Sequence, residues 1–263
     1  MHAVEYQKPK SVADAAALLA KTGGKPLAGG QSLVAAMKLR LAQPGTLVDL
    51  AGIPELAGIR KEGDALVIGA MTRHADVASS EDVKRAIPAL ATLAEGIGDR
   101  QVRNMGTLGG SIANNDPAAD WPAAVVALNA TVVTNKRRIA AGDFFKGMYE
   151  TALADDEIIT SVSFPAPKKA AYVKFPQPAS RFALVGVFVA QTGTGVRVAV
   201  TGAAPHVHRA KPIEDALAKS FTADAAKAVK IFAGHLNSDL HGSAEYRAHL
   251  VSVLASRAVA AMA

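Results

Sequence analysis

Apolar residues after Ser11 recur at helical spacing, at Val12, Ala15, Ala16 and Leu19. Asp14, three residues after Ser11, stands in the capping-box position, and Gly23-Gly24 ends the pattern. Short strand-like runs follow at residues 26–28 and 46–50. This order predicts a βαβ-type unit with a Gly-Gly loop at the carboxyl end of a strand, where ligands commonly bind.

A second mixture of strand and helix patterns follows, from about residue 56 to residue 167. The predicted elements are a hairpin of residues 56–59 and 65–69, a helix over 82–97, a helix over 121–128 with Pro122 in its first turn, and strands at 130–134 and 158–164. The residues from 103 to 120 lack a strong period and predict a long loop between these elements. The pattern indicates a second α/β unit.

The pattern changes again at about Lys168, after the proline-rich boundary Pro165-Ala166-Pro167. Alternating apolar residues predict antiparallel strands at 171–175, 182–191 and 196–202, and alanine-rich amphipathic helices are expected at 211–219, 223–233 and 244–261. We therefore expect a small C-terminal sheet covered by helices.

Two glycine-rich segments carry the candidate chemistry. The first, Leu27-Ala28-Gly29-Gly30-Gln31-Ser32-Leu33, leads into the helix-like residues 34–39, and the second runs from Arg103 to Asp120. Glycine lacks the Cβ that would keep a phosphate away, and it lets successive N–H groups converge on one anion. Neither segment has the Rossmann or the Walker spacing. Together they predict a pyrophosphate site of another kind.

Composition narrows the function classes. The 263 residues carry a net charge of +6, but their basic residues are scattered and form no stripe typical of nucleic-acid binding. The absence of cysteine excludes disulfides and a thiolate-bound iron–sulfur cluster in this chain. The two neighbouring histidines, His206 and His208, are interpreted as part of a solvated turn, so no metal site is expected. No arrangement of Ser, His and Asp suggests a hydrolase triad.

Two further features bear on location. The N-terminal residues contain no apolar h-region, and the longest apolar run, residues 182–190, is too short to span a bilayer. We expect a cytoplasmic protein without a transmembrane segment.

Several motifs together resemble one known family. They are Ala28-Gly29-Gly30-Gln31-Ser32-Leu33, Val102-Arg103-Asn104 followed by Gly106-Thr107-Leu108-Gly109-Gly110-Ser111, Asp116-Pro117-Ala118-Ala119-Asp120, Glu157-Ile158-Ile159, Tyr172-Val173-Lys174-Phe175, and Gly202-Ala203-Ala204-Pro205 followed by Arg209-Ala210. Over essentially its whole length the chain resembles the FAD-binding medium subunit of molybdenum hydroxylases, the carbon monoxide dehydrogenase and xanthine dehydrogenase family.

The resemblance implies an α+β fold with two domains. Residues 1–167 would form an FAD-binding domain of the vanillyl-alcohol-oxidase or PCMH type, with α/β subdomains of about 1–55 and 56–167. Residues 168–263 would form the family's small C-terminal α+β domain, a three-stranded antiparallel sheet with helices.

The resemblance also implies the cofactor contacts. For FAD they are Leu27, Ala28, Gly29, Gly30, Gln31, Ser32, Leu33, Val34, Ile97, Thr107, Leu108, Gly109, Gly110, Ser111, Asp120, Ile159 and Lys174. Loop N–H groups and the Ser32 and Thr107 hydroxyls would bind pyrophosphate, and Asp120 would accept bonds from cofactor hydroxyls. Ile97 and Ile159 would pack on flat rings.

The implied function is electron transfer. A large molybdopterin subunit would oxidise the substrate, a small subunit with 2Fe-2S clusters would carry the electrons, and FAD in this chain would pass them on, in a dimer of heterotrimers. No general base is expected in this chain, because the flavin supplies the chemistry.

Other readings remain open. The chain could be a stand-alone FAD-dependent oxidoreductase of the same fold, or a non-catalytic nucleotide-binding scaffold. Asp120 could be a helix N-cap, Lys174 a surface lysine, and Ile97 and Ile159 ordinary core residues.

Overall fold

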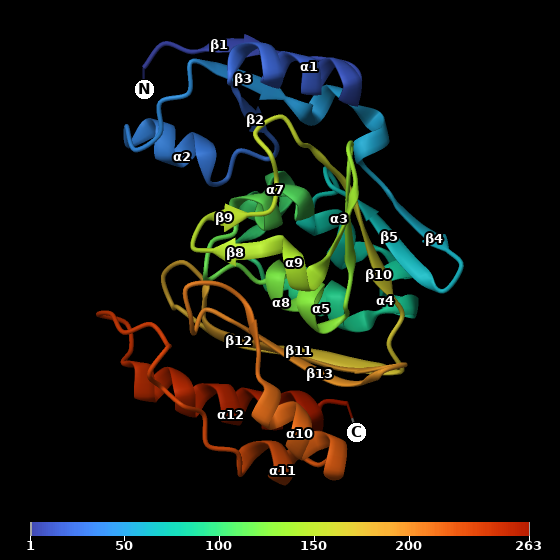
Figure 1. The fold of residues 1–263 in the computed structure, drawn as a ribbon, viewed down its shortest axis with the longest axis vertical. Helices are drawn as coiled ribbons and strands as arrows, with labels where there is room; N and C mark the ends of the chain where they lie inside the picture. Colours follow the sequence, from blue (N-terminus) through green and yellow to red (C-terminus); the bar gives the residue numbers. More distant parts are fainter. Residues whose placement is uncertain (1, 263) are drawn as a thin grey trace.

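The chain builds three successive units along the longest axis of the molecule (Figure 1). The computed structural model describes residues 2–262. The first unit comprises β1 (Glu5–Gln7), α1 (Val12–Thr22), β2 (Lys25–Leu27), α2 (Leu33–Lys38) and β3 (Thr46–Asp49). Its three strands are parallel in the order β1-β3-β2, which confirms the predicted βαβ unit. Ser11 accepts the N–H of Asp14 at 3.1 Å, and left-handed Gly23 ends α1.

The second unit is built on a five-stranded antiparallel sheet. Its order is β4-β5-β10-β6-β7, formed by Ile59–Glu62, Ala65–Gly69, Ile159–Pro165, Thr131–Thr134 and Arg138–Ala140. The helices are α3 (His74–Ser79), α4 (Glu81–Ala86), α5 (Pro88–Glu95), α6 (Arg100–Met105), α7 (Leu108–Asn114), α8 (Trp121–Ala127) and α9 (Ala141–Phe144). Short 3-10 turns, η1 (Leu50–Gly52) and η2 (Pro54–Leu56), lead into this sheet, and a small hairpin, β8 (Phe145–Gly147) and β9 (Glu150–Thr151), lies beside it.

Three predictions for this unit were wrong in detail. Residues 56–59 were expected to begin the hairpin, but Pro54 starts a 3-10 turn there, and the strand runs over Ile59–Glu62. The helix predicted over 82–97 is divided into α4 and α5, because Pro88 has no N–H to continue a helix. The segment predicted as a long loop, residues 103–120, contains the end of α6 and all of α7.

The helices in that segment have identifiable caps. Asp99 accepts the N–H of Val102 at 2.8 Å to start α6, and Thr107 accepts the N–H of Gly110 at 3.1 Å to start α7. Left-handed Asn115 ends α7. Side-chain capping therefore outweighs the low helix propensity of the paired glycines.

The third unit is a sheet with helices on one face. Its strands are β11 (Lys169–Pro176), β12 (Ala183–Thr192), β13 (Gly195–Thr201) and β14 (His208–Arg209), followed by α10 (Lys211–Lys219), α11 (Ala223–Lys227) and α12 (Ala244–Ala260). The sheet is antiparallel and four-stranded, not three-stranded as predicted, because two-residue β14 is too short to show alternation. The helix expected over 223–233 ends at Lys227, and Val229 and Ile231 pack on the core from a segment without regular secondary structure.

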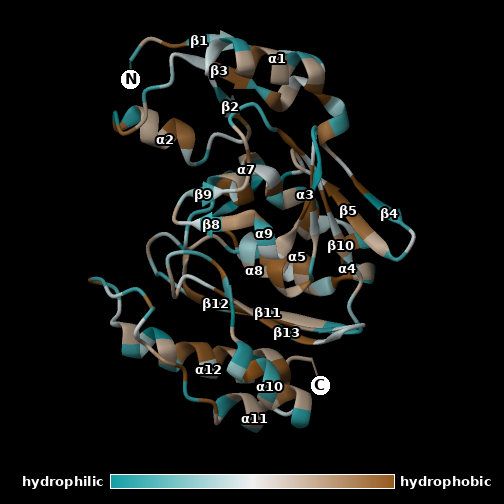
Figure 2. Cartoon of the chain, in the orientation of Figure 1, coloured by the Kyte–Doolittle hydropathy of each residue, from teal (hydrophilic) through white to brown (hydrophobic). Residues whose placement is uncertain are grey.

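This C-terminal sheet is buried on both faces. On one face Tyr172, Phe188 and Ala199 join the core of the second unit, and on the other the valines of β12 and β13 pack on α10 and α12. Figure 2 shows the apolar strands lying between these helices and the second unit. Residues 183–190 are buried throughout, which explains why this region is the longest apolar run of the sequence. The second and third units therefore share one core.

Candidate functional site

The first glycine-rich segment presents free backbone donors. Within the described residues, no acceptor is found for the N–H groups of Gly29, Gly30, Gln31 and Ser32. Gly30 has φ +70°, a left-handed conformation, and the segment ends at the start of α2. Ser32 is exposed, and its side chain makes no capping bond. This segment can therefore offer several N–H groups and a hydroxyl to an anion.

Gly29 also joins the two glycine-rich segments. A Cβ at this position would lie 1.9 Å from the carbonyl oxygen of Met105 and 2.8 Å from the Cα of Gly106. A Cβ at Gly110 would lie 3.2 Å from the Cβ of Ala28. The two segments, distant in sequence, therefore lie directly against each other, as the pyrophosphate hypothesis requires.

The second segment presents its N–H groups differently from our expectation. Each one from residue 108 to residue 111 is already bonded within the protein: Leu108 to the oxygen of Thr72, Gly109 to that of Ala70, Gly110 to the Thr107 hydroxyl and Ser111 to the oxygen of Thr107, at 2.8–3.1 Å. The predicted donation by these N–H groups to pyrophosphate does not fit, because α7 and the chain after β5 use them. Leu108 is fully buried. This segment therefore contributes no free N–H groups from residues 108–111. It forms one wall of the proposed site, where Gly110 is partly exposed and has no side chain.

Helix α6 connects this contact to a second group of predicted FAD contacts, which are Ile97, Asp120 and Lys174. Its Arg103 side chain donates from one nitrogen to the carbonyl oxygens of Ile97 and Gly98, each at 3.0 Å. Arg181, from the loop between β11 and β12, reaches the same Gly98 oxygen at 3.2 Å. Ile97 is half-buried against the core, so part of it stays accessible. Neither arginine was predicted as a contact. The bond from Arg181 joins residues 83 positions apart and leaves no local pattern in the sequence.

Asp120 forms the centre of this second group. It is 4 % exposed, and its Oδ1 accepts bonds from the Tyr172 hydroxyl at 2.6 Å and the Lys174 ammonium at 2.9 Å. Burial raises the pKa of Asp120, and the charge of Lys174 and the hydrogen bond from Tyr172 oppose that rise. Burial and the carboxylate raise the pKa of Tyr172 well above its usual range, which keeps the phenol a donor.

These contacts decide two alternatives. Asp120 stands at the N-cap position of α8, but its side chain makes no capping bond there, so its carboxylate does not stabilise the helix start in the way the N-cap interpretation required. Lys174 is not a surface lysine: its side chain is 11 % exposed, and it also donates to the oxygen of Arg181 at 2.8 Å. Asp120 and Lys174 are held together from two units of the chain.

Ile159 takes the place expected of a core residue. It is 5 % exposed and lies in the same core as Trp121 and Phe164, at the start of β10. Its side chain has little open surface, and its contact with a cofactor remains a prediction.

His74 is a buried group that the sequence patterns did not single out. Its Nδ1 accepts from Trp121 Nε1 at 3.1 Å, and a Cβ at Gly106 would lie 2.8 Å from its Nε2. Burial, together with the charge of Arg103, lowers the pKa of His74 to about 4. The ring is therefore neutral near pH 7. It packs against Gly106, which together with Met105 forms the turn that contacts Gly29.

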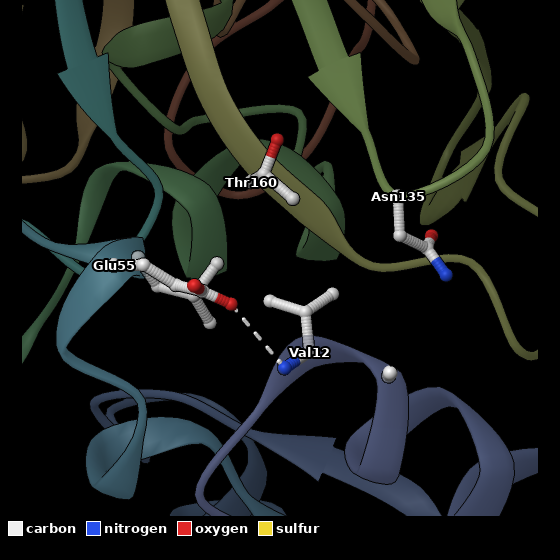
Figure 3. A pocket seen from close by; sticks show the side chains of 6 residues that line it. Val12, Glu55, Asn135 and Thr160 are labelled. Carbon is white, nitrogen blue, oxygen red and sulfur yellow. Dashed lines mark hydrogen bonds between the residues drawn. The ribbon is translucent and has the colours of Figure 1, made fainter.

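A cavity of about 580 Å³ lies away from these residues (Figure 3). It is lined by Val12, Ala13, Glu55, Leu56, Asn135 and Thr160, none of which is a predicted contact. Glu55 accepts the Val12 N–H at 3.4 Å, Asn135 accepts that of Ile158 at 2.9 Å, and Thr160 donates to Val133 at 3.1 Å. The bond from Val12 to Glu55 joins the start of α1 to η2, and we give this cavity no role.

A cluster of potential metal ligands and a membrane-spanning helix are both absent from the described residues. Among residues 2–262, no cluster of three or more His, Cys, Asp or Glu side chains is arranged to hold a metal ion. Each helix in the same range is too short or too polar to cross a membrane.

Comparison with known proteins identifies the class to which this arrangement belongs. Residues 2–167 match the FAD binding domain in molybdopterin dehydrogenase, and residues 170–262 match the CO dehydrogenase flavoprotein C-terminal domain. The chain belongs to this family of FAD-binding oxidoreductase subunits, which confirms the family inferred from the motifs and its mixed α/β architecture.

Individual relatives match over nearly their whole length. The nicotine 6-hydroxylase medium subunit of Paenarthrobacter nicotinovorans is 39% identical, with 98% of this chain and 96% of the relative covered. The carbon monoxide dehydrogenase medium chain of Hydrogenophaga pseudoflava is 39% identical over 97% of this chain and 95% of its own. A structure of carbon monoxide dehydrogenase from that organism, lacking the Mo-pyranopterin moiety, matches with a TM-score of 0.90 and 40% identity, covering 99% of this chain and 97% of that one.

The titration of His74 gives a prediction for stability. Its folded pKa of about 4 lies below its ordinary value of 6.5, so the unfolded chain takes up a proton first as the pH falls. Stability should fall by on the order of 3 kcal/mol between pH 6.5 and pH 4 from this residue. In His74→Asn, whose side-chain oxygen can still accept from Trp121, urea unfolding should show a shallower fall. Parallel curves for variant and wild type would contradict this assignment.

Proposed function

We propose that this chain is the FAD-binding electron-transfer subunit of a molybdenum-containing hydroxylase or dehydrogenase, similar to a carbon monoxide dehydrogenase medium subunit. The observation that carries the proposal is the contact between the two glycine-rich segments. Beside it, the N–H groups of Gly29, Gly30, Gln31 and Ser32 have no acceptor within residues 2–262. Membership of the FAD-binding family supports the choice of cofactor. When bound, FAD supplies the redox chemistry, receiving electrons and passing them to an external acceptor.

The chain's own residues bind and orient the cofactor. N–H groups of residues 29–32 and the Ser32 hydroxyl would hold the pyrophosphate, while Gly110 and its neighbours would shape the opposite wall. Asp120 would accept bonds from cofactor hydroxyls, and Lys174 would place a positive charge beside it. The complete proposed contact set remains Leu27 to Val34, Ile97, Thr107 to Ser111, Asp120, Ile159 and Lys174.

The proposed assembly follows from the division of labour among subunits. Relatives are named medium subunit or medium chain of larger enzymes. With no cysteine, this chain has no thiolate ligands for an iron–sulfur cluster. We infer a large molybdopterin subunit and a small 2Fe-2S subunit as partners, in a cytoplasmic dimer of heterotrimers. We also propose that the domains divide at 1–167 and 168–263.

Gly110, in the second glycine-rich segment, gives the first test of FAD binding. A Cβ at Gly110 would lie 3.0 Å from the Thr107 Oγ1 and 3.2 Å from Ala28, so Gly110→Val should push the segments apart and abolish most FAD binding. The control is Gly142→Val, because a Cβ at Gly142 meets nothing within 4 Å. FAD titration and thermal unfolding would be measured for both. A folded Gly110→Val protein with wild-type affinity would show that this wall is misassigned.

Asp120 gives a second test. Asp120→Ala should weaken FAD binding about tenfold, the effect of losing a bond of about 1.4 kcal/mol. It should also lower stability by about 3 kcal/mol by leaving Lys174 without its partner. Glu157→Ala is the matched control, since Glu157 is another buried carboxylate, paired with Arg137 at 2.9 Å outside the proposed site. Equal FAD affinity in the two variants would remove Asp120 from the contact set.

The need for partners can be tested with the purified chain. Loaded with FAD, it should be reduced by dithionite but should show no flavin bleaching with candidate substrates until the molybdenum and iron–sulfur subunits are added. The absorbance of the flavin is the readout. Substrate-dependent bleaching of the chain alone would favour a stand-alone oxidoreductase, and a purified chain with no flavin affinity would favour a scaffold.

A further inference from the structure

Among residues 2–262, Tyr172 is the one residue of the third unit that donates to Asp120 from an uncharged group. Its hydroxyl lies 2.6 Å from Asp120 Oδ1, and the residue is 8 % exposed. Lys174, two residues along the same strand, donates to the same oxygen at 2.9 Å. Residues two apart on a strand point to the same face. Strand β11 thus presents two donors to one carboxylate oxygen of the neighbouring unit.

The surroundings of Tyr172 are built to place its hydroxyl. The ring packs on Phe188, with centroids 6.0 Å apart. Gly186 interrupts the apolar residues of β12, and a Cβ there would lie 2.3 Å from the Tyr172 hydroxyl. Glycine weakens the interior of a strand, so its presence here fits a requirement for close approach. The absence of a side chain at Gly186 in the adjacent strand therefore leaves the space that the Tyr172 hydroxyl occupies.

We propose that Tyr172 is a positioning residue for the cofactor, acting through Asp120, an inference that rests on the proposed FAD function. By occupying Oδ1 together with Lys174, it fixes the rotation of the carboxylate and leaves Oδ2 as the oxygen free to accept from a cofactor hydroxyl. The tyrosine hydroxyl satisfies the carboxylate without adding a charge. The C-terminal unit therefore takes part in cofactor binding through a residue that need not touch the cofactor.

Tyr172→Phe tests this role because it removes the hydroxyl and keeps the ring. The cofactor-free full chain would be titrated with FAD, and its melting temperature measured separately. The Kd for FAD should rise about tenfold, the effect expected for one lost bond to a charged group. Tyr246→Phe is the matched control: Tyr246 is 41 % exposed, packs on Phe175, and its hydroxyl has no partner among the described residues.

A double-mutant cycle separates positioning from general stability. If Tyr172 acts through Asp120, the Tyr172→Phe effect on Kd should vanish in the Asp120→Ala background. Equal effects in both backgrounds, or a Tyr172→Phe affinity like that of Tyr246→Phe, would overturn the inference while the FAD function stands. If Asp120→Ala does not fold, the comparison of the two tyrosine variants decides. A wild-type chain without FAD affinity would overturn the proposed function and this inference together.

Discussion

The burial of the C-terminal sheet on both faces is the constraint on which the candidate site depends. Residues 183–190 of β12 have no exposed face, so the sheet must lie between its own helices and the second unit. This arrangement fixes β11 against the residues before α8. Tyr172 and Lys174 can then meet Asp120 at 2.6 and 2.9 Å. The burial of apolar strands, which has no directional preference, thereby determines where the hydrogen bonds among Asp120, Tyr172 and Lys174 can form.

The polar cluster has an energetic character different from that of the core around it. A buried ion pair recovers its desolvation cost only when further hydrogen bonds satisfy both partners. Here Lys174 also donates to the Arg181 oxygen, and Asp120 also accepts from Tyr172. Arg181 and Arg103 in turn hold the Gly98 carbonyl. The cluster is therefore better explained by its effect on the positions of these side chains than by a net gain in stability.

Sequence patterns predicted those features whose causes are local. The helix from Ser11 to Gly23, the parallel βαβ order and the antiparallel C-terminal strands all follow from spacing and capping over a few residues. The fourth strand β14 and the division at Pro88 depend on weaker or competing local signals. For the site, motifs brought Asp120 and Lys174 forward, but the bond between Tyr172 and Asp120 joins residues 52 positions apart. Only packing reveals such a pair.

The two glycine-rich segments illustrate the same limit, because similar composition serves different physical purposes in each. In the second segment, a Cβ at Gly109 would lie 2.5 Å from the Cβ of Ala70, and the N–H groups complete a helix start and a contact with the chain after β5. In the first, Gly29 permits the segments to touch, and the N–H groups beside it find no acceptor in the described part of the chain. The glycines of one segment thus allow close packing, whereas those of the other leave donors free. A pyrophosphate held here would be bonded from one side and enclosed from the other, an asymmetry that glycine counts alone could not indicate.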